Sequence, residues 1–127
     1  MFDGKLVLIV EDEGLVAADL AFALEELGGR IVGPVATVAE ALILLEEHAV
    51  AAAVLDGILA DRDVTPVALL LVDRGVPFVI HTGTALPDEL AALHPALTVL
   101  PKPQRADIVM ACLLNEMRGA GSQSLLG

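Results

Sequence analysis

The chain has 127 residues, of which 56% are hydrophobic, so it is the size of one domain that can bury a core, and general disorder is excluded. The formal net charge of −11 argues against direct nucleic-acid binding, which needs clustered Lys and Arg. Charges or turn residues interrupt every apolar run well short of the ~18 residues of a membrane span, and no leader peptide is evident, so we expect no membrane contact and a cytoplasmic location. Cys112 is the single cysteine, which excludes an internal disulfide.

Short apolar runs alternate with helix-like segments along the chain. The runs are continuous rather than alternating in polarity, which is typical of strands covered on both faces in a parallel sheet. Thr37 and Glu40 have the spacing of a capping box, and Gly28 and Gly75 stand where helices end. We predict strands at 6–10, 31–35, 51–55, 76–80 and 98–100. We predict helices at 14–27, 37–48, 66–74, 87–94 and 104–118.

Five strands that are each followed by a helix form a (βα)5 chain. With right-handed crossovers this order gives a doubly wound, five-stranded parallel sheet of the flavodoxin-like α/β class. We expect a single domain over 1–127, in which the glycine-rich segment 119–127 is a flexible tail. In such sheets function lies at the carboxyl ends of the strands.

Polar residues follow four of the predicted strands at that edge. Glu11 and Asp12 follow the first strand, Asp56 the third, Thr82 the fourth and Lys102 the fifth. Carboxylates ~5 Å apart at an effective dielectric of ~20 repel by about 3 kcal/mol a pair. A divalent cation removes that repulsion, and oxygen ligands favour Mg²⁺. Lys102 and Thr82 could then bind phosphoryl oxygens, with Asp56 as a nucleophile toward phosphorus.

The motifs "IVEDE", "VLDG", "IHTG" and "LPKP" occur in this order, each after the expected strand. Together they resemble the CheY-like receiver domain of response regulators in bacterial two-component systems, over about residues 3 to 118. The resemblance implies that Asp56 accepts a phosphoryl group from the phosphohistidine of a sensor histidine kinase or phosphotransfer protein. It also implies a stand-alone phosphorylated signalling module, not an enzyme, which acts by altered binding to a downstream protein that the sequence does not identify.

The same resemblance assigns the other site residues. Glu11 and Asp12 match the acidic pocket, and Asp12, Asp56 and the backbone carbonyl of Ile58 are the expected ligands of the Mg²⁺ cofactor. The matching phosphate-binding and switch residues are Thr82, Gly83 and Lys102, and the bond from Lys102 to Pro103 is expected to be cis.

Two departures from the family pattern concern signalling. Val99 stands where receivers commonly carry an aromatic residue on the fifth strand, and Gln104 replaces a frequent Phe. Gly83 permits unusual backbone angles, so we expect the switch to use rearrangement of the loop after Thr82 rather than an aromatic rotamer.

The last predicted helix is apolar around most of its circumference, although covering a sheet needs only a stripe about 100° wide. We interpret the surplus at Ile108, Met110 and Leu114 as a partner surface or homodimer contact. The alternative is that the tail folds over it.

Three further residues carry separate expectations. Glu13 is expected to face outward at the start of the first helix, and His81 to point away from the phosphate as a hydrogen-bonded structural histidine. "DRDVT" fits the D-x-D-x-T signature of haloacid-dehalogenase-type phosphatases, which would use Asp61 as the nucleophile, although Asp61 lies five residues beyond the strand end.

The sequence thus leaves two alternatives to a phosphorylated receiver. One is a small phosphatase of this type, and the other is a receiver-like scaffold that works without phosphorylation.

Overall fold

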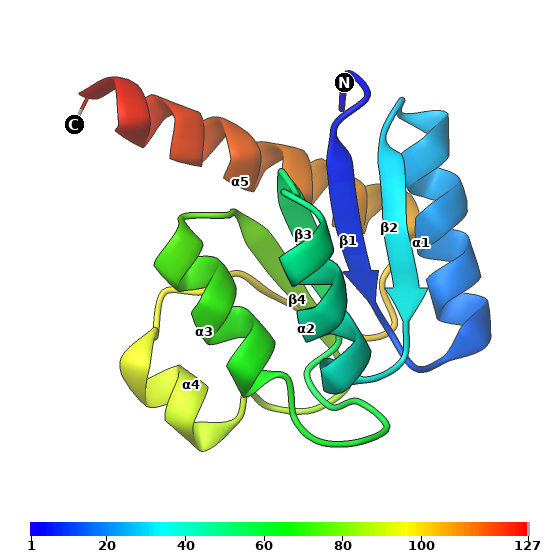
Figure 1. The fold of residues 1–127 in the computed structure, drawn as a ribbon, viewed down its shortest axis with the longest axis vertical. Coiled ribbons are helices and arrows are strands. Elements are labelled where there is room, and N and C mark those ends of the chain that lie inside the picture. The colour runs from blue at the N-terminus through cyan, green and yellow to red at the C-terminus, as the bar shows by residue number, and fades with distance from the viewer. Residues whose placement is uncertain (127) are drawn as a thin grey trace.

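Five parallel strands form one sheet in the computed structural model, which describes residues 1–126 and the side chains up to residue 120 (Figure 1). The strands are β1 (Leu6–Val10), β2 (Arg30–Val35), β3 (Ala52–Leu55), β4 (Phe78–Thr82) and β5 (Val99–Pro101). Their order in the sheet is β2-β1-β3-β4-β5, and every neighbouring pair is parallel. The predicted doubly wound, flavodoxin-like fold is therefore confirmed.

Helices cover both faces of this sheet. They are α1 (Gly14–Glu26), α2 (Val38–Glu47), α3 (Thr65–Arg74), α4 (Asp88–Leu93) and α5 (Ala106–Leu126). α1 and α5 pack together on one face, and α2, α3 and α4 follow one another across the other face (Figure 1). Among the described residues, no helix is sufficiently long and apolar for a membrane span.

Two hydrophobic cores result from the alternation of side chains along the strands. In β1, Leu8 and Val10 enter the core under α2 and α3, whereas Val7 and Ile9 enter the core under α1 and α5. All four side chains are fully buried. The continuous apolar runs were predicted to be strands covered on both faces. This prediction is confirmed for β1, whose side chains enter a core on each face of the sheet.

Local cap signals hold as predicted at two helix ends. The Thr37 hydroxyl accepts a 3.0 Å hydrogen bond from the Glu40 backbone N–H and donates one of 2.9 Å to the Glu40 carboxylate. At the other position, Gly75 ends α3 with φ of 69°, a left-handed conformation that favours glycine.

The element bounds differ from the prediction by two residues or more in β4 and α5, and by at most one residue elsewhere. β4 covers 78–82 rather than 76–80, because the Val76 backbone N–H is used to close α3 on the Leu71 carbonyl, at 2.9 Å. α5 continues beyond Arg118, its predicted end, to Leu126. Gly127 lies outside the described residues, and the flexibility expected of 119–127 stays a prediction.

Candidate functional site

The carboxyl ends of β1, β3, β4 and β5 surround a surface cavity of about 350 Å³. Parallel strands bring these ends to one edge of the sheet, so residues far apart in sequence become neighbours. The lining residues are Asp12, Glu13, Asp56, Ile58, Thr82, Gly83, Thr84 and Lys102. The structure thus brings together every predicted phosphate-binding and acceptor residue, with Glu11 buried beside them.

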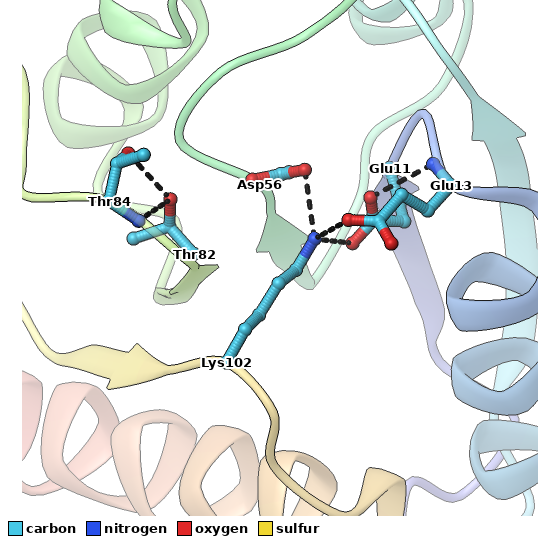
Figure 2. A network of polar contacts seen from close by, with 6 residues as sticks. All are labelled: Glu11, Glu13, Asp56, Thr82, Thr84 and Lys102. Atoms are coloured by element: carbon cyan, nitrogen blue, oxygen red, sulfur yellow. Dashed lines mark hydrogen bonds and ion pairs between the residues drawn. The ribbon is translucent and has the colours of Figure 1, made fainter.

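Lys102 is the centre of the polar network at this cavity. Its Nζ atom lies 2.9 Å from Glu11 Oε1, 3.0 Å from Glu13 Oε1 and 3.0 Å from Asp56 Oδ2 (Figure 2). Its backbone N–H donates a 2.9 Å hydrogen bond to the Thr82 carbonyl, and the bond that follows, from Lys102 to Pro103, is cis. One ammonium group therefore ties the ends of β1 and β3 to the end of β5.

Burial perturbs both members of the closest ion pair. Loss of solvation raises the pKa of Glu11 to about 7, against the opposing effect of the hydrogen bond from Lys102. Burial by itself would lower the pKa of Lys102, but hydrogen bonds to Glu11, Glu13 and Asp56 raise it above its ordinary value. The lysine is therefore held as a cation in the site.

The carboxylates outnumber the cation. Oxygen atoms of Glu11, Asp12, Glu13 and Asp56 all lie within 4.8 Å of one another. Once Glu11 is ionised, above about pH 7, the four carboxylates and one ammonium leave a charge of −3, which a divalent cation would reduce. Hard oxygen donors with open cavity space beside them suit Mg²⁺, so these residues fit the cofactor expected from the sequence.

Thr82 is buried at the cavity wall. Its Oγ1 accepts a 3.3 Å hydrogen bond from the Thr84 backbone N–H and lies 3.2 Å from Thr84 Oγ1 (Figure 2). A Cβ atom added to Gly57 would lie 2.7 Å from Thr82 Oγ1. Gly57 is thus the residue that allows Thr82 to stand beside Asp56. No sequence pattern indicated a role for Thr84, and Gly57 was noted only as part of the motif "VLDG".

The side chain of Glu13 points in a different direction from the one predicted. It does occupy the N-cap position of α1 and its side chain is exposed, but the carboxylate turns back to contact Lys102 instead of facing outward. Its backbone is extended, as at an ordinary N-cap, with φ of −88° and ψ of 111°. The reason for the contact is attraction between the carboxylate and the Lys102 ammonium, 3.0 Å apart. Its N–H also donates to Glu11 Oε2 at 3.1 Å, which joins the two acids further.

Asp61 lies away from the cavity and has a structural task. Its Oδ1 accepts a 2.8 Å hydrogen bond from the Val38 N–H, and its Oδ2 one of 3.1 Å from the Ala39 N–H. These bonds at the N-terminus of α2 lower the pKa of Asp61. The carboxylate therefore acts as a helix cap, a role that argues against its use as the nucleophile of a phosphatase.

The proposed surface on α5 is smaller than expected. Met110 is fully buried against the sheet and Leu114 is half-buried beside the same core, whereas Ile108 is exposed. The reason is that α5 packs on α1 as well as on β3 and β4, so a wider stripe of the helix is covered. Met110 therefore cannot contribute to a partner surface in this structure.

His81 is buried, as expected, but without the expected hydrogen bond. Only 3% of the residue is exposed, and neither ring nitrogen has a partner among the described residues. Burial lowers the pKa of His81, with a further contribution from the charge of Lys102, so the ring is kept neutral. An unpartnered buried polar group costs about 1–3 kcal/mol.

No family model matches the sequence, and no curated protein matches it. Among solved structures, the chain is similar to SdrG from Sphingomonas melonis Fr1, with 37% identity, a TM-score of 0.76 and coverage of 93% of this chain and 99% of SdrG. It is also similar to the response regulator PhyR from Brucella abortus, with 27% identity, a TM-score of 0.80 and coverage of 97% of this chain and 51% of PhyR. The chain therefore spans about half the length of that protein.

A third similar structure is the receiver domain of the sensor histidine kinase PA1611 from Pseudomonas aeruginosa PAO1. Identity is 23%, the TM-score is 0.75, and the match covers 91% of this chain and 98% of that domain. That structure has a magnesium ion coordinated in its active-site cleft. At this identity the likeness shows the fold alone.

A Gly57→Ala substitution tests the close approach at the cavity wall. We expect it to lower the free energy of unfolding by about 1–3 kcal/mol, because the new methyl group overlaps Thr82. Urea denaturation measures this change. Gly83→Ala is the matched control, since a Cβ atom there meets only Lys102 Cβ at 3.9 Å, an ordinary contact. Equal losses in the two variants would contradict this account of Gly57.

The raised pKa of Glu11 predicts a pH dependence of stability in metal-free protein. The folded state keeps the Glu11 proton up to about pH 7, whereas the unfolded state loses it near pH 4.5. The free energy of unfolding should therefore fall as the pH rises between these values, by about 1–3 kcal/mol from this group. Glu11→Gln should remove that part of the slope. Urea denaturation with a chelator at pH 5 and pH 8 measures it, and identical slopes in both proteins would exclude the mechanism.

Proposed function

The chain belongs to the receiver domains of response regulators, and on this premise we propose that it accepts a phosphoryl group on Asp56 and signals through altered protein binding. The observation that carries the proposal is the Lys102 ammonium, 3.0 Å from Asp56 Oδ2 and 2.9 Å from Glu11 Oε1 at the mouth of the cavity. An autonomous single-domain arrangement stays a prediction.

The phosphoryl donor in this proposal is a phosphohistidine of a sensor histidine kinase or phosphotransfer protein. A carboxylate oxygen of Asp56 forms the new bond to phosphorus while the phosphorus–nitrogen bond to the donor imidazole breaks. The bonding pair stays on the imidazole nitrogen, and the phosphoryl group becomes an acyl phosphate. Lys102 stabilises negative charge on the phosphoryl oxygens, because its ammonium is already aimed at Asp56.

The acidic residues would hold Mg²⁺ beside the acceptor. Asp12, Asp56 and the Ile58 backbone carbonyl are the proposed ligands, with Glu11 completing the acidic pocket. When bound, the ion supplies positive charge that neutralises the phosphoryl oxygens during transfer. Without it, the cluster of carboxylates would repel an incoming anionic phosphoryl group.

The response to phosphorylation would begin at Thr82. The new group adds about −1.5 to −2 charge and three acceptor oxygens. The Thr82 hydroxyl, which now contacts Thr84, can turn to donate to one of them, and the loop after β4 would move with it. Val99 supplies no aromatic ring to follow this movement, so the change would be carried by the loop itself.

Phosphorylation of the isolated protein tests the proposal directly. Incubation with acetyl phosphate and Mg²⁺ should add one phosphoryl group to the peptide that contains Asp56, as read by mass mapping. Asp56→Asn should abolish the modification because it removes the nucleophile, and Asp61→Asn should retain it. Modification that persists in Asp56→Asn, or its absence from the unsubstituted protein, would overturn the assignment and favour a scaffold that works without phosphorylation.

Magnesium should stabilise the fold, because it relieves repulsion that the folded state alone experiences. About 10 mM Mg²⁺ should raise the melting temperature by a few degrees, as measured by thermal unfolding. Asp12→Asn should reduce this gain. Asp19→Asn is the matched control, since Asp19 is an exposed acid on α1 outside the carboxylate cluster. A melting temperature that does not respond to Mg²⁺ would count against the metal site.

A further inference from the structure

The ammonium group of Lys102 already uses its full capacity for hydrogen bonding. A lysine ammonium has three N–H donors. Three carboxylate oxygens surround Nζ, at 2.9 Å from Glu11, 3.0 Å from Glu13 and 3.0 Å from Asp56 (Figure 2). A phosphoryl oxygen at Asp56 can therefore accept a hydrogen bond from Lys102 only if one of these three contacts is given up.

The three acids differ in what it costs them to leave the ammonium. The side chain of Glu11 is 1% exposed, so without Lys102 its charge would stay buried and unpaired. The side chain of Asp56 is 7% exposed and would itself carry the phosphoryl group. The side chain of Glu13 is 62% exposed, so water can solvate its carboxylate as soon as the contact breaks. Glu13 is thus the partner that Lys102 releases most easily.

Glu13 also stands on the side from which the phosphoryl group arrives. It lines the acceptor cavity together with Asp56 and Lys102, whereas Glu11 is buried beside that cavity. A phosphoryl group that enters the cavity therefore approaches Nζ next to the Glu13 carboxylate. Both groups are anions and seek the same ammonium, so they compete for it.

The Glu13 carboxylate has a second favourable position away from Lys102. Glu13 is the N-cap residue of α1, but its side chain makes no cap hydrogen bond while it contacts the ammonium. The first backbone N–H groups of a helix lack partners within the helix and attract negative charge. After release from Lys102, the carboxylate can therefore interact with the start of α1 or with water.

We propose that Glu13 is a positioning residue that holds the Lys102 ammonium in the unphosphorylated site and must release it before Lys102 can bind the phosphoryl group. This inference rests on the proposed function. The contact stabilises the state before transfer and is absent from the transition state, so it slows phosphorylation of Asp56. Loss of the phosphoryl group is not affected, because the contact is already broken in the phosphorylated protein.

The rates of phosphorylation and of phosphoryl loss test this role of Glu13. With acetyl phosphate and Mg²⁺, Glu13→Gln should be phosphorylated about two- to fivefold faster than the unsubstituted protein, the factor that one partly exposed ion pair gives. After the donor is removed, both proteins should lose the phosphoryl group at the same rate. Mass spectrometry of the intact protein at successive times measures both rates.

Glu25→Gln is the matched control, because it removes the same charge from an exposed position near the other end of α1. Its rate of phosphorylation should equal that of the unsubstituted protein. Equal or slower phosphorylation of Glu13→Gln would overturn the inference, as would the same acceleration in Glu25→Gln or a parallel change of both rates in Glu13→Gln. If none of the three proteins is phosphorylated, the proposed function fails and this inference fails with it, so the two failures are distinguishable.

A second measurement uses the unsubstituted protein and does not depend on the stability of a variant. The ¹³C resonance of the Glu13 side-chain carboxylate, assigned by its absence from Glu13→Gln, should move on phosphorylation because the ammonium is withdrawn. The corresponding resonance of Glu25 should stay where it is. A Glu13 resonance that does not respond to phosphorylation would overturn the inference.

Discussion

The contact of one lysine ammonium with three carboxylates is the interaction on which the site depends. The sheet order places the ends of β1 and β3 side by side, and both ends carry acids. Without a cation between them, Glu11 and Asp56 would repel across a buried gap. Lys102 reaches them from the end of β5, on the far side of β4. The ends of β1, β3 and β5 are therefore held near one another by the charges of Lys102 and the carboxylates as well as by the packing of the core.

The loop between β3 and α3 holds the acceptor residue by contacts with a neighbouring helix. Leu59 is buried in the core, the Ala60 N–H donates to the Ala36 carbonyl at 3.2 Å, and Asp61 caps α2. Asp63 accepts a 2.9 Å hydrogen bond from the Thr65 N–H where α3 begins. The loop is thus held by several hydrogen bonds and a buried side chain, whereas Gly83 and Thr84, which follow β4 at the site, are exposed.

The sequence predicted the fold and the convergence of Asp56 with Lys102 because both follow from periodicity and strand order. Continuous apolar runs require two covered faces, and parallel strands require a common edge. The direction of a single side chain next to that edge does not follow from periodicity, which is why the contact of Glu13 with Lys102 was missed. The burial of Met110 was missed for the same reason, since it depends on how α5 packs against α1. The sequence also did not predict that the ring nitrogens of His81 lack hydrogen-bond partners among the described residues, because this depends on which polar groups the neighbouring elements place within reach.

The two outermost strands share a chemical feature with a consequence for assembly. β2 contains Pro34 and β5 ends at Pro101, and β5 is only three residues long. Proline has no N–H to donate, and a short strand offers few free backbone groups, so neither border of the sheet is a good template for an added strand. Both borders of the sheet are therefore poor templates for edge-to-edge aggregation.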